Sequence, residues 1–199
     1  MQQKTRVKSI LIVSGIIATM LTGTTLATPS SEALSYTCAG CHGTNGASNG
    51  PAIPSLAGLS KDYLVEAMQA YKEDEKNPTI MNRIAKGYSD KEFELMGDFF
   101  SAQKVHRITN QPYDNAKAVE GKKLHEKYCS ACHSEGGTVT DDEVGLLSGN
   151  SAYFLRFALA DFQDGVRDMP KKMKKQIKKM LKKDKDAFDK LIHYYSKGE

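Results

Sequence analysis

The sequence predicts an all-α protein built from two similar halves. Apolar residues recur at helical spacing in several segments, and no stretch shows the strict apolar–polar alternation of a half-buried strand. Segments of the first half also recur 91 residues later. The matching segments are Leu56-Ala57-Gly58 with Leu147-Ser148-Gly149, and Tyr63-Leu64 with Phe154-Leu155. A constant offset of this kind indicates an internal duplication.

The first half contains three predicted helices. One covers Ser31 to Cys38, a second covers Lys61 to Lys72, and a third begins at Ser89. In the second of these helices, apolar side chains three and four residues apart share one face, namely Leu64, Ala67, Met68 and Tyr71. Ser89 is a favourable N-cap, and Asp90 and Glu92 place negative charge in the first helical turn.

The second half repeats this pattern. Helices are predicted from Ala116 to Cys129 and from Ser151 to Gln163, and one long terminal helix is predicted from Lys174 to Lys197. The intervening stretch KVHRITNQPYDN lacks an apolar face and contains Pro112, which is typical of a linker.

The organisation of the chain follows from these segments. We expect a signal peptide at residues 1–27, a first domain at 28–104, a linker at 105–115 and a second domain at 116–199. The leader has a basic start followed by the apolar run ILIVSGIIATML, which is well short of the ~18 residues needed to span a bilayer. Cleavage is expected after Ala27, with Ala33 as the weaker option, so the mature protein is predicted to be exported.

The charge of the mature chain argues against a nucleic-acid partner. Three of the 28 Lys and Arg residues lie in the leader, which leaves 25 against 24 Asp and Glu. Nucleic-acid binding requires a clear basic excess, which is missing here. Charge is concentrated at one place, however, because residues 171–199 hold eleven Lys and only four acidic residues. This segment is either a docking surface for an acidic partner or, as we favour from sequence, a solvated helix face.

All four cysteines occur in two copies of the frame Cys-x-x-Cys-His. The copies are Cys38-Ala39-Gly40-Cys41-His42 and Cys129-Ser130-Ala131-Cys132-His133. Disulfides are the usual state of cysteines in exported proteins, but they give no reason for a histidine after each second cysteine. A zinc site would have to join pairs that lie 91 residues apart. The frame instead matches covalent attachment of haem c, in which two thiols on one side of a helical turn bind the porphyrin and the histidine binds the iron.

The second axial ligand of each iron is predicted to be a methionine. Met81 follows His42 by 39 residues and lies after Pro78, before the helix that is predicted to begin at Ser89. Met173 follows His133 by 40 residues and is the favoured ligand in the second half, with Met169 as the alternative. Ligation by methionine sulfur is typical of electron-transfer haems.

Other candidates near the irons are assigned to different roles. Met68, Met96 and Met180 are expected in the core, and the three histidines outside the frames (His106, His125 and His193) are expected at the surface or in packing. The carbonyl of Pro51 is the expected hydrogen-bond acceptor for His42, and no acceptor is assigned for the second half.

The motifs resemble a known family. The tandem frames are similar to those of the dihaem class I cytochromes c. More narrowly, TCAGCHGTNGASNGPAIPSLAG, TIMNRIAKGYSDKEFELMGDFF, KLHEKYCSACHSEGG and YFLRFALADFQDGVRDMPKKM resemble the cytochrome subunit of flavocytochrome c sulfide dehydrogenase. The resemblance implies two covalently bound haem c groups and a periplasmic heterodimer with a flavoprotein subunit. It also implies FAD on that partner only, and a soluble or membrane-associated acceptor such as a c-type cytochrome.

The residues agree that substrate chemistry lies elsewhere. The chain has no G-x-G-x-x-G motif after a strand for a dinucleotide, and haem attachment would use every thiol. We therefore expect an electron-transfer subunit that is not an enzyme by itself. Two alternatives stay open: a free dihaem carrier that delivers electrons to a terminal oxidase, and a dihaem enzyme such as a peroxidase.

Overall fold

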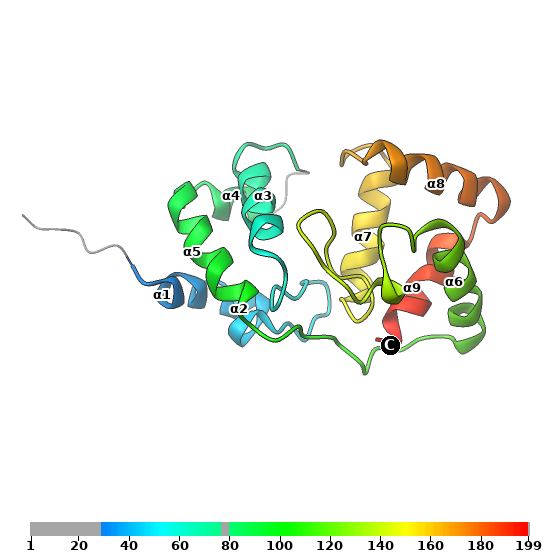
Figure 1. The fold of residues 1–199 in the computed structure, drawn as a ribbon, viewed down its shortest axis with the longest axis horizontal. Coiled ribbons are helices and arrows are strands. Elements are labelled where there is room, and N and C mark those ends of the chain that lie inside the picture. The colour runs from blue at the N-terminus through cyan, green and yellow to red at the C-terminus, as the bar shows by residue number, and fades with distance from the viewer. Residues whose placement is uncertain (1–28, 77–79, 199) are drawn as a thin grey trace, which may run out of the picture.

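The computed structural model describes residues 29–76 and 80–198, and all the regular structure within these ranges is helical. This confirms the predicted all-α class. Figure 1 shows two helical halves joined by an extended connection. None of the helices in these ranges combines the length and the apolar character that a membrane crossing requires. The predicted leader, residues 1–27, lies outside the described part of the chain.

The first half contains five α-helices and one 3-10 turn in its described part. They are α1 (Ser31–Tyr36), α2 (Ala39–His42), η1 (Thr44–Gly46), α3 (Lys61–Lys72), α4 (Ile80–Ala85) and α5 (Asp90–Ser101). The helix starts follow local capping chemistry. The Ser30 hydroxyl accepts the Ala33 N–H, and Ser89 forms a reciprocal capping box with Glu92. The alternative cleavage point after Ala33 would cut through α1.

The second half contains α6 (Asn115–Tyr128), η2 (Glu135–Gly137), α7 (Ala152–Gln163), α8 (Lys171–Lys183) and α9 (Ala187–Ser196). The prediction of a single terminal helix is therefore wrong, because the helical structure is interrupted between α8 and α9. Asp184 has extended backbone (φ −143°, ψ 106°), and its carboxylate accepts the Asp186 N–H at 3.0 Å. A short acidic side chain that bonds the backbone in this way competes with helix continuation.

The internal duplication is visible in the backbone hydrogen bonds. Equivalent bonds hold the loop after each frame. In the first half, the N–H of Leu56 donates to the Gly46 carbonyl, and the N–H of Gly58 donates to the Phe100 carbonyl in α5. In the second half, the N–H of Leu147 donates to the Gly137 carbonyl, and the N–H of Gly149 donates to the Tyr195 carbonyl in α9. The repeated sequence segments thus occupy repeated positions in the fold.

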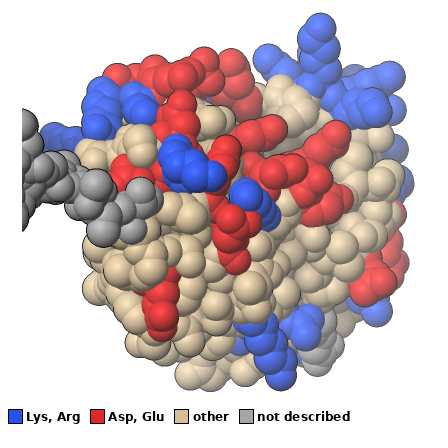
Figure 2. All heavy atoms as spheres, turned by 60° about the vertical axis from the view of Figure 1, so that its left-hand side comes forward, with Lys and Arg blue, Asp and Glu red and all other residues tan. Residues whose placement is uncertain are grey.

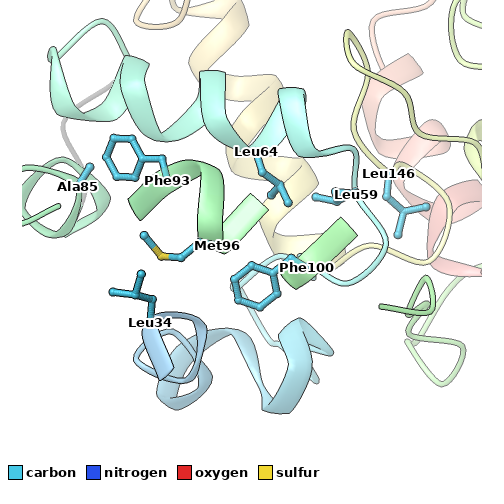
Figure 3. Close-up of a cluster of buried hydrophobic side chains, with 8 residues drawn as sticks. All are labelled: Leu34, Leu59, Leu64, Ala85, Phe93, Met96, Phe100 and Leu146. Atoms are coloured by element: carbon cyan, nitrogen blue, oxygen red, sulfur yellow. The ribbon is translucent and has the colours of Figure 1, made fainter. Parts of the chain in front are cut away.

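The core of the first half includes a residue from the second. Leu34, Phe93, Met96 and Phe100 form its centre, and Leu146, which is 2% exposed, joins them through contact with Leu59 and its neighbours (Figure 3). The second core contains Met180, which is fully buried as predicted, with Leu155, Ala187, Leu191, Ile192 and Tyr195.

Polar contacts also join the halves. The hydroxyl of Ser151 donates to the carbonyl of Pro51, and that of Ser60 donates to Asp142. Gly145 lies so close to the Tyr63 ring that a Cβ at this position would be 2.5 Å from the phenol oxygen. The two halves therefore share an interface with specific backbone and side-chain contacts.

Helices α6 and α9 make the closest crossing in the second half. A Cβ added at Gly121 would lie 2.1 Å from the carbonyl oxygen of Lys190 and 2.9 Å from Cβ of Tyr194. Only glycine allows the two helix backbones to approach this closely. The crossing holds α6 in place as it leads into the second Cys-x-x-Cys-His frame.

Candidate haem-binding sites

The first frame is a single helical turn. Cys38 is the N-cap of α2, and the N–H of His42 donates to the carbonyl of Cys38 at 2.9 Å. Cys38 is half-buried and Cys41 is exposed, and both thiols are free. A turn of this kind places thiols three positions apart on the same side.

The His42 ring is held by a backbone carbonyl. Its Nδ1 lies 2.9 Å from the carbonyl oxygen of Pro54, and the residue is only 9% exposed. The expectation of Pro51 as acceptor is wrong, because the Pro51 carbonyl instead accepts from Ser151 of the second half. With Nδ1 engaged as a donor, Nε2 is the nitrogen left to bind a metal.

The second frame repeats the turn. The N–H of His133 donates to the carbonyl of Cys129 at 2.9 Å, Cys129 is half-buried and Cys132 is exposed. Within the described residues, the Nδ1 atom of His133 is buried and has no hydrogen-bond partner. The second half therefore reproduces the position of the histidine without the carbonyl contact seen at Pro54.

The electrostatics favour neutral imidazoles and protonated thiols. Burial lowers the pKa of His42, against a smaller opposing effect of the Pro54 carbonyl. Burial also lowers the pKa of His133, and the charge of His125 lowers it further. Burial raises the pKa of the Cys38 thiol and raises that of Cys129 to about 11. Neutral imidazoles are metal ligands, whereas redox-active cysteines need lowered pKa values.

The candidate methionine ligands occupy two kinds of position. Met81 is the second residue of α4, a short helix that was not predicted, and it precedes α5 as expected. Residues 77–79 before α4, which include Pro78, are outside the described part. Met169 lies in the connection before α8, and Met173 lies in the first turn of α8. All three methionines are half-buried, so burial does not separate Met169 from Met173. The methionine assignments stay predictions.

A buried histidine–tyrosine pair beside the second frame was not foreseen. His125, which is 1% exposed, lies four residues before Cys129 on α6, and its Nδ1 is 2.9 Å from the phenol oxygen of Tyr195 on α9. His193 has a packing role as expected, because its ring nitrogen accepts the Asp114 N–H at 3.0 Å. The spacing of one helical turn between His125 and Cys129 was the sequence signal that could have indicated the contact between His125 and Tyr195.

These arrangements fit covalently attached haem. Each half offers two free thiols on one turn, followed by an imidazole whose pKa is lowered by burial; His42 is buried and His133 is half-buried. Among the described residues, no cluster of three or more His, Cys, Asp or Glu side chains provides a separate metal site. Haem c in such a site supplies reversible one-electron oxidation and reduction. The chain would hold it through Cys38, Cys41 and His42, and through Cys129, Cys132 and His133.

The comparisons with known proteins agree with this geometry. Residues 30–110 match the family described as Cytochrome c. Cytochrome c4 of Stutzerimonas stutzeri is 30% identical over 149 residues, which cover 65% of this chain and 69% of that protein. The chain therefore belongs to the class I cytochromes c.

A solved structure specifies the kind of cytochrome. Reduced recombinant cytochrome c4 from Pseudomonas stutzeri superimposes with a TM-score of 0.68 at 25% identity, covering 85% of this chain and 98% of that one. The chain is thus a tandem, dihaem member of the family, with an electron-transfer role.

A third relative matches a shorter part of the chain. The cytochrome subunit of sulfide dehydrogenase of Chlorobaculum tepidum is 44% identical over 69 residues, which are 35% of this chain. The matched region spans 62% of that relative's length.

Proposed function

We propose that this chain is the periplasmic electron-transfer subunit of a flavocytochrome c sulfide dehydrogenase, formed after removal of the leader at 1–27. The observation that carries the proposal is the 44% identity to a sulfide dehydrogenase cytochrome subunit over 69 residues. The segments of both halves that resemble the cytochrome subunit of flavocytochrome c sulfide dehydrogenase support the same proposal.

The roles of the individual residues follow from the two frames. Cys38, Cys41, Cys129 and Cys132 would attach the porphyrins, and His42 and His133 would bind the irons. Met81 and Met173, with Met169 as the alternative to Met173, would complete the coordination. The chain would hold the two haems, and the contacts between its halves would set their relative position.

The partner would carry the substrate chemistry. An FAD-containing subunit would oxidise sulfide and pass electrons to this chain, and an acceptor such as a c-type cytochrome would receive them. The use of all four cysteines in haem attachment supports this division, because it would leave no thiol in this chain to act as a nucleophile toward sulfur.

Isolation of the native protein tests the proposal. An affinity tag at the C-terminus should retain a flavoprotein along with the cytochrome, and the visible spectrum should give one flavin for every two haems. Addition of sulfide should then reduce the haem bands, whereas sulfide added to the cytochrome subunit alone should reduce them far more slowly. A tagged cytochrome that elutes without flavin, and that fails to associate with a co-expressed flavoprotein, would refute the assignment.

A free dihaem carrier is the second candidate. It is favoured by the similarity to cytochrome c4, which covers 85% of this chain and 98% of the solved chain. The same purification separates the two possibilities, because a free carrier would elute without flavin and would be oxidised rapidly by a terminal oxidase.

A further inference from the structure

Helix α8 presents a dense row of cations. Eight of its thirteen residues are lysines, it contains no acidic residue, and all eight lysines are exposed. We refer to these residues as the lysine face: Lys171, Lys172, Lys174, Lys175, Lys178, Lys179, Lys182 and Lys183. Figure 2 shows basic side chains gathered at the upper right, at the level of α8 in Figure 1, apart from the acidic side chains on the rest of that view.

The helix is divided into two sides by its sequence. At 100° per residue, the lysines occupy one half of the helix circumference, and the opposite half carries Met173, Ile177, Met180 and Leu181. Met180 is fully buried, and Ile177 and Leu181 pack against the second core. The apolar side thus anchors α8 to the domain and leaves the lysine face directed to solvent.

The charge of this face is not compensated within the described residues. None of the ion pairs there involves a lysine of α8. Lys190 on α9 shows the contrast, because it pairs with Glu120 at 2.6 Å and with Asp184 at 2.8 Å. Crowded like charges repel one another, so the face lowers stability unless another molecule supplies anions.

The lysine face is also specific to the second half. The equivalent segment of the first half, α4, contains one cation, Arg83, and Lys86 just after it is paired with Asp74 at 2.5 Å. A cytochrome domain of this type therefore folds without such a face. The lysine face is therefore not needed for folding, and its role is sought in binding another molecule.

The position of the face connects it to the second haem site. Met169 and Met173, the two candidate ligands, lie just before α8 and in its first turn. Whichever of them binds the iron, the lysine face begins beside that site. A partner seated on α8 would therefore contact the segment that is expected to complete the second haem site.

We propose that the lysine face docks an acidic electron-transfer protein, which exchanges electrons with the haem of the second half. The inference rests on the electron-transfer role of the chain and not on the identity of the flavoprotein. A protein partner fits better than a membrane surface. A helix that lies in a membrane inserts its apolar side, and here that side is packed into the protein. Complementary charge would accelerate the encounter with an acidic protein.

The test compares two variants of the haem-loaded protein. The first carries Lys171→Gln, Lys175→Gln and Lys178→Gln, at the centre of the lysine face. The matched control carries Lys104→Gln, Lys122→Gln and Lys123→Gln, which removes the same charge from exposed positions elsewhere. Haem spectra and circular dichroism establish that both variants carry two haems and are folded.

The measured quantity is the second-order rate constant for oxidation of the reduced protein by plastocyanin, a small acidic copper protein. At low ionic strength we expect the first variant to react about fivefold more slowly than wild type and the control to change less than twofold, with the difference vanishing in high salt. Anionic ferricyanide should follow the same order, whereas cationic tris(phenanthroline)cobalt(III) should react faster with the first variant.

Two results would overturn the proposal. One is an equal loss of rate in both triple variants, which would reflect total charge only. The other is binding to vesicles with about 30% phosphatidylglycerol that only the first variant loses, together with unchanged rates toward plastocyanin. That outcome would assign the face to a membrane surface. Absence of a flavoprotein partner, which would refute the proposed sulfide dehydrogenase, would leave these rates unaffected.

Discussion

Single residues decide how each iron site is completed. The Pro54 carbonyl fixes the ring of His42 at 2.9 Å, whereas the buried Nδ1 of His133 lacks such a contact in the described residues. A hydrogen bond from the ring nitrogen that does not bind the metal increases the basicity of a metal-bound imidazole. The two sites are therefore chemically different despite their common origin.

The methionine assignment gives the first prediction. The ferric protein should show the near-infrared absorption of sulfur-to-iron ligation from both halves. Met81→Leu should remove about half of it, Met173→Leu should remove the other half, and Met169→Leu should leave the spectrum of wild type. Loss of absorption in Met169→Leu with retention in Met173→Leu would transfer the role to Met169.

The buried pair His125–Tyr195 gives the second prediction. Tyr195→Phe removes the partner of a buried ring nitrogen and should lower the free energy of unfolding by about 1–3 kcal/mol. Adding His125→Leu should recover part of this loss, because an apolar pair leaves no unsatisfied polar atom. Denaturant unfolding of the haem-loaded variants measures both values. A double variant that is less stable than Tyr195→Phe would contradict this explanation.

Helix packing is the next scale, and Gly121 is its most sensitive point. Gly121→Ala would place a methyl group 2.1 Å from a backbone carbonyl oxygen of α9. The helices would have to separate, so we expect a loss of about 1–3 kcal/mol or more in the free energy of unfolding. Lys122→Ala is the matched control, because it changes the neighbouring position of α6, which is exposed. Thermal unfolding of both variants gives the comparison, and equal stability would show that the crossing tolerates a side chain.

Carboxylates at the same crossing make stability depend on pH. Hydrogen bonds from Lys190 and Lys117 hold the pKa values of Asp184 and Asp189 below the usual value of 3.8. Carboxylates with lowered pKa values in the folded state stabilise it above the pKa of the unfolded state, and this contribution disappears as the pH falls through the folded value. Stability should therefore decline below about pH 4. In the double variant Asp184→Asn and Asp189→Asn, the free energy of unfolding measured between pH 2 and 6 should depend less on pH than in wild type. An unchanged dependence would show that other residues cause the loss of stability in acid.

Elements with strong local signals could be predicted from sequence. Helix α3 has the predicted bounds because its apolar spacing is regular, and α5 begins where Ser89 and Glu92 form the capping box. The break at Asp184 was missed because the lysine-rich pattern continues toward it with helical spacing. The use of Pro54 in place of Pro51 depends on how the loop is placed by the other half, and no local pattern carries that information.

Haem attachment matters at the scale of the whole molecule. Each half has about 80 residues, which is small for a self-sufficient core. Replacing Cys38, Cys41, Cys129 and Cys132 by Ala should prevent attachment and leave a chain with much weaker helical circular dichroism and no cooperative thermal transition. Replacing only the first pair should spare part of the signal. A haem-free chain that unfolds cooperatively at the temperature of wild type would contradict this expectation.

Leu146 makes the core of the first repeat depend on the second. This side chain belongs by sequence to one repeat and by location to the interior of the other, where it is 2% exposed. Excision of either repeat would open a void in its neighbour or leave an unsheltered leucine. Each repeat therefore depends on the other for a complete interior, and we expect the two to unfold in a single cooperative transition.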